Sequence, residues 1–191
     1  YASNTIARAI RFVKTICKHA KSNGLETSYQ LDNIKIKYSK VGSIYLTFEE
    51  LSKIEKIAKK KLTDSLENAR DWLIISCYTG QRVSDFMRFT NEQIRIENDK
   101  SLIEFTQKKT GKLMTVPLHP KVLEILKKRK REFPYAISAQ KYNDYIKDIC
   151  EIAEINQLEN GSKLKETEPE SGIYRKETGM YKKYELVTSH I

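Results

Sequence analysis

The feature that most constrains the fold of this chain is a double change in the spacing of its apolar residues. Apolar residues follow helical spacing over residues 65–78, alternate with polar residues in three short runs, and return to helical spacing after Pro120. The three runs cover residues 93–97, 102–107 and 113–118. The pattern predicts an α+β fold that is mostly helical and contains a small three-stranded antiparallel sheet.

Further elements are predicted from helical spacing and from residues typical of helix and strand ends. Asn98-Asp99 and Thr110-Gly111 supply turn residues between the three runs. Besides the helix over 65–78, we expect helices over residues 5–22, 47–61, 83–89, 120–131 and 139–156.

Other segments carry weaker signals. Thr47 and Glu50 form a capping box, which predicts the start of the helix over 47–61. The lysines over 59–61 would lie at the end of that helix and complement the negative end of its dipole. Residues 34–38 alternate apolar residues with lysines, which predicts a short strand. Residues 157–183 are polar and contain three glycines and a proline, and we predict a long loop for them.

The charge of the chain favours a polyanionic partner. The chain has 35 lysines and arginines against 25 acidic residues, for a net charge of +10, and nucleic acid is the simplest explanation. Proteins bound to ribosomes or to anionic membranes share this property. The helix over 5–22 carries Arg11, Lys14 and Lys18 on one face. That face is either a solvated surface or a surface laid along DNA phosphates.

The cysteines and histidines argue against disulfides and metals. Cys17, Cys77 and Cys150 are odd in number, far apart and set among apolar residues, which is typical of buried free thiols in a reducing cytoplasm. The three histidines show no metal-ligand spacing with them. We expect no metal and no cofactor, and the lack of an apolar run of 18 residues predicts no membrane span.

Three short segments hold candidate catalytic residues. Arg82 begins a predicted helix after Thr79-Gly80-Gln81, where it either binds an anion with free backbone N–H groups or pairs with Asp85. Lys108, Lys109 and Lys112 lie at a predicted hairpin tip, where lysines are commonly just solvated. His190 follows Thr188-Ser189 at a predicted helix start, although a lone histidine is more often structural.

Taken in order, these segments resemble the catalytic domain of the tyrosine recombinases, or phage integrase family, particularly integrases of bacterial mobile elements. The family pattern T-G-x-R-x-S-[DE] is matched by residues 79–85. Its lysine hairpin and V-P-L ending are matched by Lys109-Thr110-Gly111 and Val116-Pro117-Leu118, and its T-x-H-x-x-R motif begins at Thr188. The resemblance covers roughly residues 44–191, and residues 46–51 resemble the start of the domain.

The resemblance implies two domains and an incomplete catalytic set. Residues 1–42 would be the C-terminal part of a helical, SAM-like core-binding domain plus a linker, and residues 43–191 the catalytic domain, incomplete at its C-terminus. The family's second arginine, second histidine or tryptophan, and tyrosine nucleophile find no matching positions. We therefore expect the full-length protein to act as a tetramer on double-stranded DNA, and these 191 residues alone to be monomeric and inactive.

The resemblance also implies a role for each candidate residue. The family cuts DNA through a 3′-phosphotyrosyl intermediate and needs neither metal nor ATP. Arg82 would stabilise the scissile phosphate, supported by Asp85. Lys109, or less favourably Lys108, would protonate the leaving oxygen, and His190 would hold the phosphate or assist proton movement. Arg11, Lys14, Lys18, Lys108 and Lys112 are the expected DNA-binding residues.

Three other interpretations stay open at the level of sequence. A type IB topoisomerase shares the chemistry, although the short sheet and the T-G-Q-R context favour the integrases. A noncatalytic DNA-binding module could have the same fold. A basic helical protein associated with RNA or the ribosome is the third alternative, and a salt-dependent preference for duplex DNA over RNA would argue against it.

Overall fold

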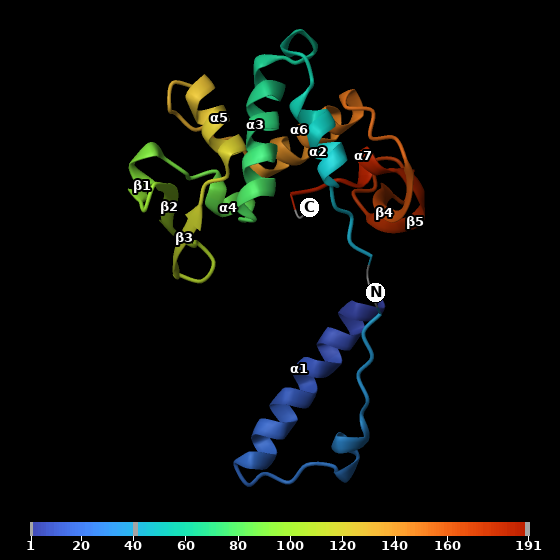
Figure 1. The fold of residues 1–191 in the computed structure, drawn as a ribbon. Helices are drawn as coiled ribbons and strands as arrows, with labels where there is room; N and C mark the ends of the chain where they lie inside the picture. Colours follow the sequence, from blue (N-terminus) through green and yellow to red (C-terminus); the bar gives the residue numbers. More distant parts are fainter. Residues whose placement is uncertain (1, 40–41, 190–191) are drawn as a thin grey trace. The chain divides into compact units, whose positions relative to one another are not determined.

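The computed structural model describes residues 2–39 and 42–189, and the chain divides into two compact units, 1–42 and 43–191. In the first unit, α1 (Ser3–Ser22) is followed by a 3₁₀ turn, η1 (Tyr29–Asn33), and an extended segment that runs back along α1 (Figure 1). Asn4 exchanges two hydrogen bonds with the backbone of Ser39, at 3.0 and 2.8 Å. The helix expected over 5–22 is confirmed.

The strand predicted over residues 34–38 is wrong. These residues are extended but pair with no strand in the described part of the chain. Instead, Lys14 Nζ of α1 donates to the carbonyl of Ile34 at 2.8 Å, and the guanidinium of Arg11 lies 5.0 Å from the centre of the Tyr38 ring. The alternation therefore reflects packing of the segment on one helix. No helix among the described residues is long and apolar enough to cross a membrane.

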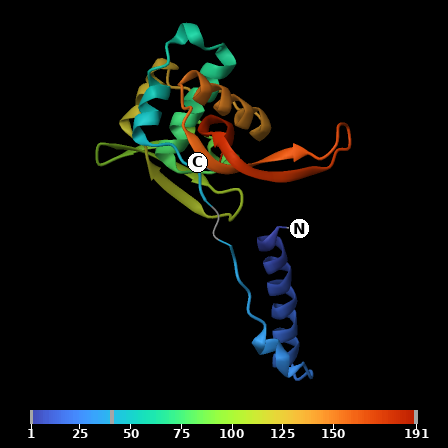
Figure 2. The ribbon, with the colours of Figure 1, turned by 90° about the vertical axis from the view of Figure 1, so that its right-hand side faces the viewer.

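The second unit contains the remaining elements (Figures 1 and 2). Its helices are α2 (Phe48–Glu55), α3 (Asp64–Thr79), α4 (Val83–Phe86), α5 (Pro120–Lys128), α6 (Ala139–Ile152) and α7 (Lys183–Leu186), with 3₁₀ turns η2 (Lys59–Lys61) and η3 (Asn91–Gln93). Its strands are β1 (Ile94–Glu97), β2 (Lys100–Thr106), β3 (Leu113–Pro117), β4 (Leu158–Glu166) and β5 (Tyr174–Lys182).

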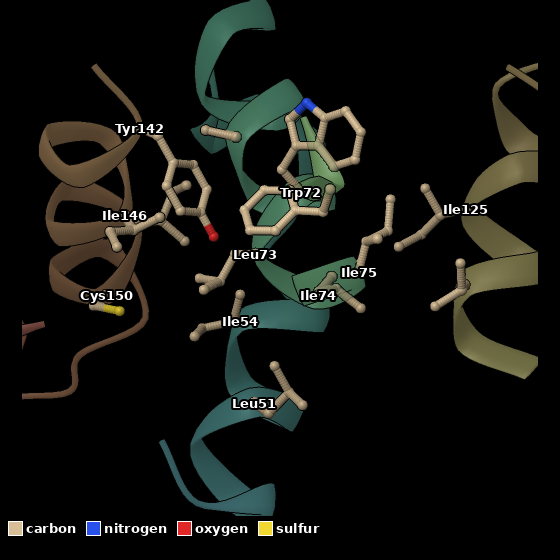
Figure 3. Packing of buried hydrophobic residues seen from close by; sticks show 14 of the residues in the cluster. Leu51, Ile54, Trp72, Leu73, Ile74, Ile75, Ile125, Tyr142, Ile146 and Cys150 are labelled. Atoms are coloured by element: carbon tan, nitrogen blue, oxygen red, sulfur yellow. The ribbon is translucent and has the colours of Figure 1, made fainter. Parts of the chain in front are cut away.

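The core is built around α3, which packs against α2, α4, α5 and α6. Figure 3 shows Tyr142, Ile146 and Cys150 of α6 on one side of α3 and Ile125 of α5 on the other, with Leu51 and Ile54 of α2 beside its lower part. A helix that is apolar on several sides belongs in the interior of a domain. The side chain of Trp72 is fully buried, and its ring N–H donates to the carbonyl of Tyr135 at 3.0 Å.

The three-stranded sheet has the predicted order β1-β2-β3, with both pairs antiparallel. Asn98 and Asp99, which join β1 to β2, have positive φ values of 49° and 60°. Two residues with positive φ make the kind of turn whose twist suits a tight hairpin. The meander expected from the alternation and the turn residues is confirmed.

The end of α2 differs from the prediction. The helix stops at Glu55, and Lys59–Lys61 form a separate 3₁₀ turn, so the lysines do not complement its dipole. After Glu55 the chain leaves the helix, and Ile57 packs in the core. Arg70 Nη1 donates to the carbonyl of Ile57 at 3.3 Å, which fixes this turn. Helices α5 and α6 also end earlier than predicted, at Lys128 and Ile152.

The loop predicted over residues 157–183 is wrong, because β4 and β5 form a long antiparallel hairpin. Figure 2 shows this hairpin extending away from the helices. Its register runs from Leu158 opposite Lys182 to Glu166 opposite Tyr174. Few apolar residues alternate in it, and hydrogen bonds between the two strands hold it together.

All three thiols are free, as expected, but only Cys150 is fully buried, whereas Cys17 and Cys77 are partly exposed. Burial raises the pKa of Cys77 to about 11 and that of Cys150 to about 12.

Candidate active site

Arg82 is positioned by the end of α3. The helix stops because Gly80 adopts a left-handed conformation, with φ of 63°, and its N–H donates to the carbonyl of Ser76 at 2.8 Å. Two residues later, Arg82 is the N-cap of α4 and is exposed. Its guanidinium has no hydrogen bond or ion pair with any residue in the described ranges. The alternative in which Arg82 simply pairs with Asp85 is therefore wrong.

Asp85 instead joins α4 to the hairpin between β2 and β3. Its side chain is completely buried, and Oδ1 accepts hydrogen bonds from the backbone N–H of Lys108 at 2.8 Å and from Arg88 Nη2 at 3.2 Å. The other oxygen, Oδ2, has no partner within residues 2–39 and 42–189. The element that carries Arg82 is thus bonded directly to the base of the lysine hairpin.

The turn of this hairpin is ordered by its own hydrogen bonds. The N–H of Gln107 donates to the carbonyl of Lys112, and that of Gly111 to the carbonyl of Gln107, both at 2.9 Å. Gly111 has a φ of 66°, which favours glycine. The Gln107 amide also donates to Oε1 of Gln81 at 3.5 Å, which links the turn to the loop before Arg82.

Lys108, Lys109 and Lys112 are exposed, and their ammonium groups make no hydrogen bond or ion pair with the described part of the chain. Arg82 and these lysines are therefore cations that have no partner in the part of the chain that the structure describes, and the elements that carry them are bonded to one another. Such an arrangement can receive an anion, and a guanidinium combined with an ammonium suits a phosphate.

His190 lies outside the described residues, so its place relative to Arg82 and the hairpin stays a prediction. The chain is described as far as Ser189, whose N–H donates to Oδ1 of Asn143 on α6 at 2.7 Å. Val187 is fully buried in the core. The segment that leads to His190 is therefore attached to α6.

Arg88 is a further charged residue at this place, and the sequence motifs do not single it out. Its Nε donates to the carbonyl of Ser84 at 3.0 Å, and its Nη2 donates to Asp85 Oδ1 and to the carbonyl of Thr106 at 3.1 Å. The available signal was the spacing of three residues between Asp85 and Arg88, which places the two side chains on the same side of a helix.

The candidate DNA-binding residues of α1 differ in whether their charged groups already have partners. Arg11 and Lys14 are engaged within their own unit by Tyr38 and by the carbonyl of Ile34. Lys18 is exposed and lines a shallow groove with the other two. Arg11 and Lys14 would therefore have to exchange internal contacts for contacts with phosphate.

Residues 44–160 match the phage integrase family, and this stretch covers more than half of the chain. The chain belongs to the phage integrase family. Among curated proteins, no sequence matches it. The family resemblance inferred from the ordered motifs is thus confirmed by an independent comparison.

Several solved structures of λ integrase have a similar fold. For λ integrase (residues 75–356) bound to DNA, the TM-score is 0.58 at 18% identity, over 81% of this chain and 59% of that one. A λ integrase dimer bound to a COC′ core site gives 0.56 at 20% identity, over 81% and 60%. A λ integrase tetramer bound to a Holliday junction gives 0.53 at 20% identity, over 78% and 47%.

This member of the phage integrase family spans three-fifths or less of the length of those λ integrase chains. At these identities the likeness establishes the fold. The expected architecture, mostly helical with a small three-stranded antiparallel sheet, is confirmed.

Proposed function

We propose that this protein is a site-specific DNA recombinase that cuts and rejoins double-stranded DNA by transesterification through a 3′-phosphotyrosyl intermediate. The observation that carries the proposal is the guanidinium of Arg82, which has no partner among the described residues. It belongs to a family motif and lies on the element bonded to the base of the lysine hairpin. Residues 43–191 would form the catalytic domain, and residues 1–42 the end of a core-binding domain and its linker.

In this proposal, Arg82, Lys109 and His190 are the catalytic residues. A tyrosine oxygen attacks the scissile phosphorus, the P–O5′ bond breaks, and the 5′ oxygen takes a proton. None of the eleven tyrosines in this sequence matches the family's nucleophile. Arg82 binds the nonbridging oxygens, whose charge grows in the transition state, and losing such a donor typically slows a reaction by about 10²–10³-fold.

Lys109 is proposed as the general acid that protonates the 5′ oxygen. Its ammonium is exposed and has no partner among residues 2–39 and 42–189, so it can approach a bound phosphodiester. Asp85 supports the site through the hairpin, since its contacts are with Lys108 and Arg88. Lys108 and Lys112 would bind the DNA backbone, as would Arg11, Lys14 and Lys18 on α1.

The partner, assembly and location of the protein are part of the proposal. The net charge of +10 suits duplex DNA, and one similar structure is of a λ integrase tetramer bound to a Holliday junction. We accordingly propose a tetramer on DNA for the whole protein, acting in the cytoplasm.

Covalent capture tests this proposal without knowledge of the target site. The full-length protein is mixed with a pool of nicked duplexes of random sequence, so that cleavage releases a short strand and traps the adduct. Denaturant-resistant protein–DNA species are collected and sequenced. The proposal predicts adducts enriched in one site and linked through a tyrosine, whereas binding without any adduct would indicate a noncatalytic DNA-binding module.

A further inference from the structure

We infer that Arg88 is a positioning residue that holds the lysine hairpin against the helix carrying Arg82. This inference rests on the proposed function, because the hairpin matters for catalysis only if Lys109 protonates the leaving oxygen. Arg88 is placed to act through the hairpin backbone and not by touching the DNA phosphate at the site.

The contacts of Arg88 connect α4 with the end of β2, and we call this connection the joint. On α4 it donates to the carbonyl of Ser84 at 3.0 Å and to Asp85 Oδ1 at 3.2 Å. On β2 it donates to the carbonyl of Thr106 at 3.1 Å, at the last residue before the hairpin turn. One planar guanidinium thus fixes both sides of the joint, which a single ammonium cannot do with the same geometry.

Asp85 makes the joint depend on Arg88. The Asp85 side chain is fully buried, and within the described ranges Arg88 supplies its one ion pair. Oδ2 has no partner there, so the carboxylate depends on two donors, Arg88 and the N–H of Lys108. A buried carboxylate that loses its cation is strongly destabilised. Removing Arg88 should therefore weaken the hydrogen bond between the N–H of Lys108 and Asp85 Oδ1.

Lys109 is the next residue after Lys108, so movement of this backbone moves the proposed general acid. Misplacing a reacting group by about 1 Å can slow a reaction on the order of 10²-fold. The expected defect is confined to protonation of the 5′ oxygen, because the backbone that presents Arg82 is fixed separately by the end of α3 at Gly80.

The joint itself is testable in the 191-residue chain by amide hydrogen exchange. We expect Arg88→Ala and Arg88→Lys to speed exchange at Lys108, while α3 stays protected as in the wild type. Arg95→Ala is the matched control, since Arg95 is a similarly exposed, ion-paired arginine on β1 whose partners are Glu97 and Glu104. Unchanged exchange at Lys108 in both Arg88 variants would overturn the inference.

The catalytic consequence is testable in the full-length protein with a bridging 5′-phosphorothiolate. The duplex is one selected by covalent capture, prepared with either oxygen or sulfur at the 5′ bridging position. A thiolate leaves without a proton because the pKa of a thiol is about 8.5, far below that of an alcohol. We expect Arg88→Ala to slow adduct formation on the order of 10²-fold with oxygen, and to approach the wild-type rate with sulfur.

The outcomes separate the inference from the proposed function. Wild-type protein that forms no adduct on either substrate refutes the recombinase proposal. Active wild type with an Arg88→Ala defect that sulfur does not relieve refutes the positioning role, as does full rescue by Arg88→Lys. Rescue by lysine would mean that a cation beside Asp85 is sufficient and that the guanidinium is not needed to hold Ser84, Asp85 and Thr106 together. Equal loss of duplex binding and cleavage would also refute it.

Discussion

At the residue scale, the carboxylate of Glu50, at the start of α2, is buried and ion-paired. Lys183 Nζ lies 2.8 Å from both of its carboxylate oxygens, and the N–H of Thr47 donates to Oε2 at 2.7 Å. Burial alone would raise the pKa of Glu50, but the hydrogen bonds and charge of Lys183, together with Thr47, hold it below its usual value. The pair attaches the end of the β4–β5 hairpin to α2.

This pair predicts a specific loss of stability in acid. Because the pKa of Glu50 is lower in the folded protein, its contribution is complete above its ordinary pKa of 4.5 and is lost as the pH falls through the folded value. Glu50→Gln should lower the free energy of unfolding at pH 7 by about 3–5 kcal/mol and flatten its decline in acid. Urea unfolding from pH 7 to pH 3 measures both.

Glu92→Gln is the control for this series, because Glu92 is exposed on η3. It should behave like the wild type. An acid profile of Glu50→Gln that is as steep as that of the wild type would contradict the account of the pair.

At the element scale, the two hairpins of the second unit, residues 43–191, show what the sequence can and cannot reveal. The three-stranded sheet was predictable because apolar residues alternate in its strands and Asn98-Asp99 makes a tight turn. The β4–β5 hairpin was not, because charged residues and glycine make up most of its two strands. Its pairing depends on the backbone and on contacts with α7, which is distant from β4 in sequence.

The β4–β5 hairpin packs closely on α7 at Gly161. A Cβ atom at Gly161 would lie 2.6 Å from Leu186 Cδ1, so a larger residue must displace that side chain. At Gly179, directly opposite in the register, an added Cβ would lie 3.6 Å from the Tyr181 ring, which is ordinary contact. We expect Gly161→Ala to lower stability by about 1–3 kcal/mol, and Gly179→Ala to have a much smaller effect.

Denaturant midpoints of the two glycine variants make the comparison directly. Adding Leu186→Ala to Gly161→Ala should cost less than the sum of the two single changes, since the smaller side chain leaves room for the new methyl group. Equal effects at the two glycines would mean that the hairpin does not pack on α7 as described.

At the scale of the whole molecule, the sequence indicated which elements lie together better than it indicated the contacts that join them. Arg82 and the hairpin lysines were identified from their order along the chain, and their elements are indeed bonded together through Asp85. The contacts of Arg88 were not visible in the sequence, because its hydrogen bond to the carbonyl of Thr106 joins residues 18 positions apart. Likewise, the expected support of Arg82 by Asp85 is replaced by a contact with the hairpin backbone.

The positive charge of the chain predicts binding that depends strongly on salt. The logarithm of the affinity for duplex DNA should fall linearly with the logarithm of salt concentration, by about 0.9 per phosphate contacted. If Lys112 contacts a phosphate, Lys112→Ala should reduce that slope by about 1. Fluorescence anisotropy with duplex DNA and duplex RNA of matched sequence measures this, and tighter binding to RNA at every salt concentration would favour an RNA-associated protein.

The central claim is that Arg82 acts on the scissile phosphate, and comparing cleavage with binding in Arg82→Ala tests it most directly. The rate of covalent adduct formation is measured with full-length protein on a captured nicked duplex, beside the affinity for the same DNA. We predict that the variant loses about 10²–10³-fold in rate and keeps nearly all of its affinity. An unchanged rate, or rate and affinity that fall together, would contradict the claim.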